Sequence, residues 1–217
     1  IEDKKIHVYA SSSFIAKWGA GSALKDLFEK QNLFKVELID STDMARTLEK
    51  INADGDSSPA DVVMSLDQFE ISRLGNKIKW REIDKPNHIN FSNELKQVTA
   101  QKNFIPYNWA PLTMVRHQSN SESITSLKDL LKPEFKSKIA LEDPRTSTPG
   151  LQFLAWIFEN KNSEEALKFL KELGPQIHSY SPTWSSAYGL FKGGQAEMVF
   201  SYVTSPVYHH VEEKDDS

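Results

Sequence analysis

The chain has 217 residues, of which 39% are hydrophobic and 26% are charged, with a formal net charge of −4 and no cysteine. A chain of this length forms one large or two small domains. Nucleic-acid binding needs a clustered excess of Lys and Arg, so the evenly mixed charges predict no nucleic-acid partner. The lack of cysteine excludes disulfides, thiol nucleophiles and thiolate metal sites.

No apolar run reaches the about 18 residues that a membrane-spanning helix needs. The first five residues, IEDKK, do not resemble a signal peptide. This pattern is typical of a mature exported protein whose signal peptide is absent, and equally of a cytoplasmic protein.

Strand-like and helix-like segments alternate in the first part of the chain. The predicted strands are 5–10, 34–39 and 61–65, and the predicted helices are 22–31 and 43–51. In the first of these helices, Leu24, Leu27 and Phe28 share one face. Strands that alternate with helices indicate parallel βαβ units in a three-layer α/β fold.

The alternation returns after an irregular polar stretch at 80–102. The predicted strands are 103–107, 113–117, 138–141 and 197–202, and the predicted helices are 126–131, 149–160, 163–173 and 183–192. In helix 149–160, Leu151, Leu154, Ala155 and Phe158 are predicted to share a stripe. Asn162 and Glu165 predict a capping box at the next helix. Two such α/β lobes, joined by extended crossings, predict a hinged clamshell with a small-molecule cleft.

Residues 143–150, DPRTSTPG, place an arginine and three hydroxyl groups directly ahead of a predicted helix. Free backbone N–H groups, the positive end of the helix dipole and nearby hydroxyls form a site for phosphate or carboxylate. Ser147, Thr148 and Arg145 are its candidate residues. In the alternative, Ser147 or Thr148 only caps the helix.

Aromatic residues form a second group of candidates. Trp184 and Tyr188 lie four residues apart, on one face of a helix, and Tyr202 and Tyr208 flank a Thr-Ser-Pro segment. Such rings can hold a flat cationic heterocycle by stacking and cation–π attraction. In the alternative, each ring packs in a core, and the same two interpretations apply to Trp18.

Asp43 begins a predicted helix at the carboxyl end of a strand, where open α/β sheets bind ligands. The alternative role is a helix N-cap. The six His residues lack the spacing of metal ligands, and we predict no metal site. The chain contains no Walker loop and no nucleophile elbow, and we predict no catalytic residue.

Three motifs, in order and spacing, resemble those of the thiamine-binding periplasmic proteins of ABC transporters. They are DPRTSTPG at 143–150, WSSAYGLF at 184–191 and SYVTSPVYH at 201–209. Segments 8–19 and 60–67 resemble that family too. The resemblance implies a two-lobed clamshell of the periplasmic-binding-protein (type II) class, with three-layer α/β/α lobes. It also implies a periplasmic, non-enzymatic protein without a cofactor, which binds thiamine, thiamine monophosphate or thiamine diphosphate for an ABC permease in the inner membrane.

Carried over position by position, the resemblance implies that Ser147 and Thr148 contact the phosphate, with Trp184 at the same end. It implies that Tyr202 and Tyr208 pack on the rings of the ligand. It further implies roles for two residues of the first lobe: Asp43 binds the aminopyrimidine, and Trp18 forms part of the wall of the cleft.

Two departures bear on the ring-binding wall. The family often has Tyr where this chain has Ser11, and Gly where it has Met44. The unusual segment 107–111 contains Trp109, which is a candidate to replace the lost ring. Ser11, Trp109, Arg145 and Tyr188 are therefore additional candidates for ligand contact.

A third departure is that the family continues well beyond the equivalent of Ser217 and returns to complete the first lobe. The implied domains are 1–103, an incomplete first lobe, 104–205, the second lobe, and 206–217, the start of the return. A separate chain or segment would complete the first lobe, whose apolar surface would otherwise be exposed.

Three other functions stay open. The same clamshell could bind another phosphorylated amine or ferric iron, or report its ligand to a receptor. A thiamine-degrading enzyme on a similar clamshell would use a cysteine nucleophile, which this chain lacks.

Overall fold

The structure divides the chain into two compact units, residues 1–108 and 109–217. This computed structural model describes residues 4–17, 19–41, 44–74, 76–84, 89–95, 101–117 and 124–214. Residues 206–208 lie in α9 (Ser205–Tyr208), which belongs to the second unit. The predicted return of 206–217 to the first lobe stays a prediction.

The units divide a few residues after the predicted boundary at 103/104, because the stretch before residue 108 packs on the first unit. Phe104 lies edge-on to Trp80, and Tyr107 edge-on to Phe14, with ring centroids 5.2 and 5.9 Å apart. The strand predicted at 103–107 is wrong, since this stretch is irregular. Individual large side chains hold this stretch on the first unit, in place of a ladder of backbone hydrogen bonds to a neighbouring strand.

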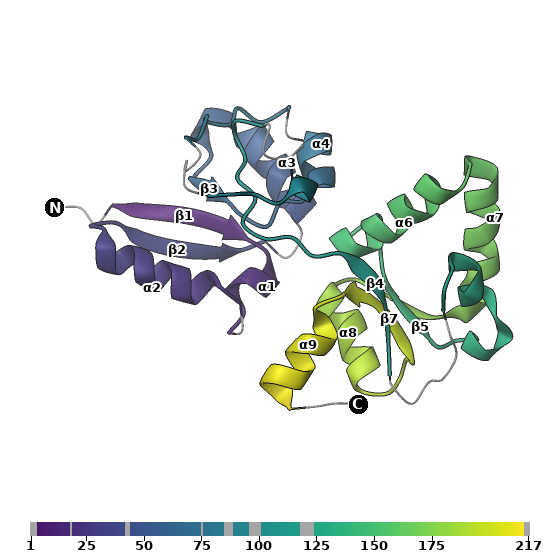
Figure 1. Cartoon of the computed structure of the whole chain (residues 1–217). Coiled ribbons are helices and arrows are strands. Elements are labelled where there is room, and N and C mark those ends of the chain that lie inside the picture. The colour runs from purple at the N-terminus through teal and green to yellow at the C-terminus, as the bar shows by residue number, and fades with distance from the viewer. Residues whose placement is uncertain are drawn as a thin grey trace. The chain divides into compact units, whose positions relative to one another are not determined.

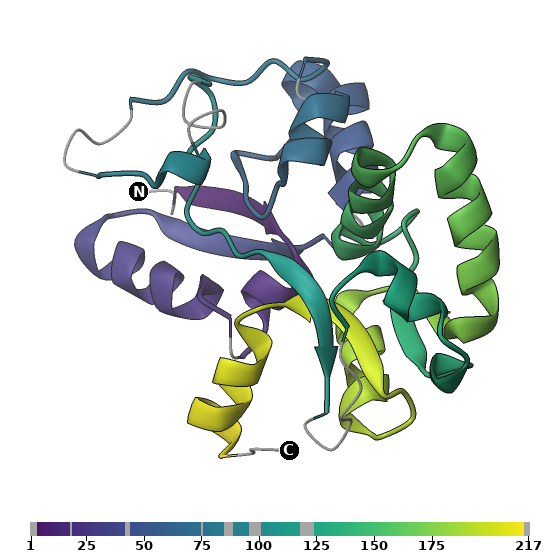
Figure 2. The same cartoon turned by 45° about the vertical axis from the view of Figure 1, so that its right-hand side comes forward.

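In the first unit, a parallel sheet has the order β2-β1-β3. Its strands are β1 (Lys5–Ala10), β2 (Lys35–Asp40) and β3 (Val62–Val63), and its helices are α1 (Ser12–Ile15), α2 (Gly21–Gln31), α3 (Met44–Asp54) and α4 (Gln68–Leu74). Single 3₁₀ turns lie at Gly55–Ser57 and Asn93–Leu95. Figures 1 and 2 show α2 on one side of this sheet and α3 with α4 on the other. The predicted βαβ units of the first part of the chain are confirmed.

The outer face of α2 carries large apolar side chains that remain exposed. Leu24 is 47% exposed, Leu27 53% and Phe28 37%, and Leu33 in the following turn is 97% exposed. The predicted stripe therefore does share one face, but this face is not buried within the described residues. An apolar patch of this kind is expected of a surface that another segment or chain covers.

The second unit contains a mixed sheet with the order β4-β7-β5-β6. Its strands are β4 (Leu112–Arg116), β5 (Ile139–Glu142), β6 (Ile177–Ser181) and β7 (Met198–Tyr202). β5 runs parallel to both β6 and β7, whereas β4 is antiparallel to β7. The carboxyl ends of β5, β6 and β7 therefore lie at one edge of the sheet.

Helices cover both faces of this sheet, so the predicted three layers are confirmed for the second unit (Figure 1). The helices are α6 (Thr148–Asn160), α7 (Ser163–Leu173), α8 (Trp184–Lys192) and the short α9. 3₁₀ turns lie at Leu127–Leu131, Pro133–Phe135 and Gly174–Gln176, and a π-helical turn at His209–Glu213. Ile139 and Leu141 of β5 pack in a cluster with α6 and α7, whereas Ala140 packs in a cluster with α8. This alternation follows from the pleat of a strand covered on both faces.

Local signals in the second unit mostly hold. Asn162 accepts a hydrogen bond from the backbone N–H of Glu165 at 3.0 Å, and Glu165 accepts one from Asn162 at 3.3 Å, so the predicted capping box is confirmed. The predicted stripe of α6 is not the one that the core buries most deeply. Its buried side chains include Phe153 and Ile157, while Phe158 is 42% exposed.

Candidate functional site

Two well-formed helices begin at the carboxyl edge of the second sheet. β5 leads through residues 143–147 into α6, and β6 leads through Pro182 and Thr183 into α8. The loops are tied together, because Thr146 Oγ1 donates to the Pro182 carbonyl at 2.7 Å and the Asp143 N–H donates to the Ser181 carbonyl at 2.8 Å. This edge is where α/β folds usually bind ligands.

The start of α6 has the geometry of an anion site. Ser147 occupies the N-cap position with an extended backbone and is 9% exposed, but its side chain makes no capping hydrogen bond. The alternative in which Ser147 caps the helix is therefore not what the structure shows. Thr148 is the first helical residue, so it is not the cap either. The first turn of any helix also has N–H groups without intrahelical partners.

Gly150 allows α6 to approach the strand closely. A Cβ atom at this position would lie 2.5 Å from the backbone oxygen of Glu142. Because that oxygen belongs to the sheet, any larger residue would push the start of α6 away from the carboxyl edge. The first turn of α6 therefore packs directly against the end of β5.

Arg145 is bonded within its own loop. Its Nε atom donates to Asp143 Oδ1 at 2.9 Å, and Nη2 donates to Oδ2. The hydrogen bonds from Arg145 hold the pKa of Asp143 at about 2. The Arg145 side chain is 85% exposed. Its predicted contact with a ligand stays a prediction.

The aromatic candidates of α8 and β7 form one cluster. The rings of Trp184 and Tyr188 stack with centroids 4.9 Å apart, and Tyr202 is tilted against Trp184 at 6.0 Å. The indole Nε1 of Trp184 donates to Ser201 Oγ at 2.9 Å, which fixes the ring at the start of α8. The predicted common face of Trp184 and Tyr188 is confirmed, and Trp184 and Tyr202 are half-buried.

Tyr188 lies deeper than its neighbours, at 7% exposure. Its hydroxyl shares a hydrogen bond with His209 Nε2, and the two rings stack with centroids 5.4 Å apart. The structure therefore places Tyr188 in the core that supports Trp184, as the packing alternative states. Its contact with a ligand stays a prediction.

Three more candidates lie within the described residues. Tyr208 in α9 is 43% exposed and Trp109 is 49% exposed. Ser11, in the first unit, caps α1 by accepting from the Phe14 N–H at 3.4 Å. Trp18 and Asp43 lie outside the described residues.

Comparisons with known proteins place this arrangement in a family. The sequence profile of the family described as "Bacterial extracellular solute-binding protein" matches residues 23–215. The chain belongs to this family. A "Thiamine-binding periplasmic protein" of Brucella abortus biovar 1 (strain 9-941) is 34% identical over 217 residues, covering 98% of this chain and 63% of its own length. The protein of the same description from Escherichia coli (strain K12) is 31% identical, covering 97% and 63%.

A solved structure described as "Periplasmic thiamin binding protein" superposes on this chain with a TM-score of 0.84 at 29% identity. The match covers 100% of this chain and 67% of the other. The predicted periplasmic-binding-protein fold is thus confirmed. The chain spans less than two thirds of the length of the curated relatives it matches.

Sequence reasoning missed three buried polar residues of this solute-binding family member. Ser201 is fully buried and its hydroxyl lies 2.9 Å from that of Ser205. Glu142 is 2% exposed, and neither of its carboxyl oxygens has a hydrogen-bond partner among the described residues. Burial raises the pKa of Glu142 to about 8. The sequence signal that could have revealed Glu142 is an acidic residue directly after the apolar run Ile-Ala-Leu. The predicted strand ended one residue before it, at residue 141.

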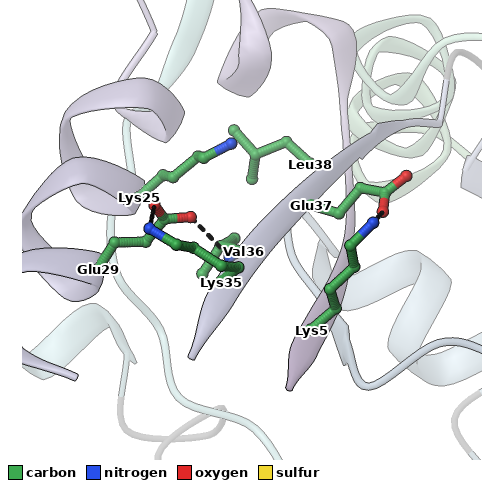
Figure 3. A pocket seen from close by; sticks show the side chains of 7 residues that line it. All are labelled: Lys5, Lys25, Glu29, Lys35, Val36, Glu37 and Leu38. Atoms are coloured by element: carbon green, nitrogen blue, oxygen red, sulfur yellow. Dashed lines mark hydrogen bonds and ion pairs between the residues drawn. The ribbon is translucent and has the colours of Figure 1, made fainter. Parts of the chain in front are cut away.

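A surface pocket of about 500 Å³, between α2 and the edge strand β2, is lined by none of the candidate residues (Figure 3). Four of the charged side chains that line it are paired. Glu29 accepts from the Val36 N–H at 2.8 Å and from Lys35 Nζ at 3.2 Å, and Lys5 pairs with Glu37 at 3.5 Å. These bonds satisfy an exposed sheet edge, which is a structural role.

Within the described ranges, no group of three or more His, Asp or Glu side chains is placed to hold a metal ion. Of the helices that the structure describes, none is long and apolar enough to span a membrane.

Proposed function

We propose that this chain is the ligand-binding part of a periplasmic protein that captures thiamine or a thiamine phosphate for an ABC permease. One observation carries the proposal. The start of α6 at Ser147 and Thr148, which has no side-chain cap, and the aromatic cluster of Trp184 and Tyr202 lie at the same edge of the second sheet. The names of the relatives at 31–34% identity point to the same ligand.

Thiamine pairs a permanently cationic thiazolium ring with a tail that is an alcohol or a phosphate ester. The phosphate would receive hydrogen bonds from the Ser147 and Thr148 hydroxyls and from the free N–H groups of the first turn of α6. The electron-rich faces of Tyr202 and Tyr208 would attract the cationic ring. Asp43, Trp18, Ser11 and Trp109 remain candidates for the rest of the ligand.

The proposed cycle is capture and release of an unchanged ligand. The protein binds the ligand in the periplasm and delivers it to the permease. No covalent step is needed, and a hydroxyl-lined helix start with an aromatic wall supplies binding rather than nucleophilic chemistry.

Calorimetry on the intact protein tests the proposal with thiamine, thiamine monophosphate and thiamine diphosphate. The double substitution Ser147→Ala and Thr148→Ala should weaken both phosphate esters by about tenfold or more, since hydrogen bonds to a charged group are worth about 1.5–3 kcal/mol each. Its effect on free thiamine should be less than about threefold.

Ser163→Ala is the matched control, because Ser163 is an exposed residue in the first turn of α7, which starts away from this edge. No heat with any of the three ligands, from protein shown to be folded, would refute thiamine as the ligand. Equal losses for the esters and for free thiamine would show that the two hydroxyls do not meet the phosphate.

A further inference from the structure

Glu142 lies between the starts of α6 and α8. Its backbone oxygen touches the position of Gly150 in the first turn of α6. Its side chain faces α8, because Ala140, two residues earlier in the same strand, packs in the cluster that includes Ala187, Tyr188 and Phe191. The carboxyl group therefore lies beneath the first turn of α8.

The neighbours of Glu142 on this face are polar but uncharged. Ser181 is its partner in the β6 register, and the pairing of Ala140 with Val199 brings it level with Ser201 on β7. Ser201 in turn holds the indole of Trp184, which confirms that this face lies under the start of α8.

The titratable groups around Glu142 are engaged with other partners. On the α8 face, Tyr188 is bonded to His209, and in the following loop Arg145 is paired with Asp143. By strand alternation, His178 and Tyr180 of β6 face the opposite side of the sheet, whereas Tyr202, at the end of β7, is tilted against Trp184. Within the described residues, neither carboxyl oxygen of Glu142 receives a hydrogen bond. A buried carboxyl group without a hydrogen-bonding or charged partner binds a proton and becomes neutral, because an unpaired charge is costly to bury.

We propose that Glu142 links anion binding at this edge, where α6 starts without a side-chain cap, to a proton, so that the edge accepts a phosphate group only while the Glu142 carboxyl is neutral. The physical reason is like-charge repulsion. A carboxylate at the end of β5, beneath the first turn of α8 and in the residue whose backbone meets the start of α6, would oppose the positive ends of the two helix dipoles and repel a phosphate in a poorly solvated site. Glu142 is thus a specificity-determining residue that lowers affinity for phosphate esters at alkaline pH. The inference deepens the proposed function and rests on it for the identity of the anion.

The test is calorimetry of the intact protein between pH 7 and pH 9, a range in which a phosphate monoester, whose second pKa is about 6, is already doubly ionised. Since burial raises the pKa of Glu142 to about 8, Kd for thiamine monophosphate should rise about tenfold over this range. Kd for free thiamine should change less than about twofold, because its tail carries no phosphate. Glu142→Gln should abolish the rise, which assigns the rise to this residue, and the exposed Glu159→Gln should retain it.

Inorganic phosphate and infrared spectroscopy separate this inference from the thiamine proposal. Wild-type protein should show a carboxylic-acid band that is absent in Glu142→Gln and that persists to higher pH when phosphate is bound, because linkage is reciprocal. If thiamine compounds fail to bind but phosphate binding shows this Glu142-dependent pH profile, the thiamine function fails and the proton link stands.

If the esters bind with a pH profile that Glu142→Gln leaves intact, the proton link is overturned and the thiamine function stands. If Glu142→Gln does not fold, the infrared titration of the wild type decides. An acid band that phosphate does not shift, or the absence of a band titrating near neutral pH, overturns the inference.

Discussion

Glu142→Gln should change how the stability of the protein depends on pH. In the folded protein the pKa of Glu142 is raised by burial from 4.5 to about 8. A raised carboxyl pKa means that the folded state holds a proton that the unfolded chain releases above pH 4.5. Stability is therefore highest below that value and falls as pH rises toward 8. The Gln side chain has nearly the same shape and cannot ionise.

The free-energy difference between the two proteins follows from the two pKa values. Between pH 5 and pH 7 the wild type should lose on the order of 3 kcal/mol of unfolding free energy relative to Glu142→Gln. The buried amide of Gln will itself lack partners, at a cost of about 1–3 kcal/mol. That cost is independent of pH, so the slope of the difference, rather than its value at one pH, is the quantity to measure.

Urea denaturation, followed by tryptophan fluorescence at pH 5, 6, 7 and 8, measures this slope. Glu159→Gln is the control, since Glu159 is exposed at the end of α6 and should follow the wild type. If the stability difference between wild type and Glu142→Gln is constant across this range, the carboxyl is not held neutral by burial, and the physical basis of the proton link is wrong.

Two further predictions concern the second unit. Gly150→Ala should lower the unfolding free energy by about 1–3 kcal/mol, because the added methyl meets the Glu142 backbone oxygen at 2.5 Å. As the control, a methyl group added by Gly189→Ala in α8 meets nothing within 4 Å, so this change should be neutral or stabilising by up to about 1 kcal/mol. Equal effects of the two substitutions in urea denaturation would contradict the close approach of α6. Asn162→Ala removes the reciprocal cap of α7 and should cost about 1 kcal/mol, and an unchanged urea midpoint would show that the capping box contributes nothing.

Much of the candidate site could be predicted because its signals are local. The segment 143–150 carries its own turn, hydroxyls and helix start, and the four-residue spacing of Trp184 and Tyr188 puts them on one face whatever surrounds the helix. The same locality explains the correct capping box at Asn162. Whether Ser147 caps α6 was left open by the sequence, since a cap and an anion site use the same residue types, and only the hydrogen-bond geometry separates them.

What the sequence alone determined was the α/β alternation, the helix starts and the order of the motifs, because each depends on periodicity or on residues a few positions apart. Only the tertiary structure decided which apolar stripe of α6 is buried, since that helix has apolar residues on more than one side and its neighbours select Phe153 and Ile157. It also decided that Tyr188 is core and that Glu142 is buried beneath the start of α8 without a hydrogen-bond partner among the described residues. Burial and isolation are properties of what surrounds a residue in space, and neighbours distant in sequence supply those surroundings.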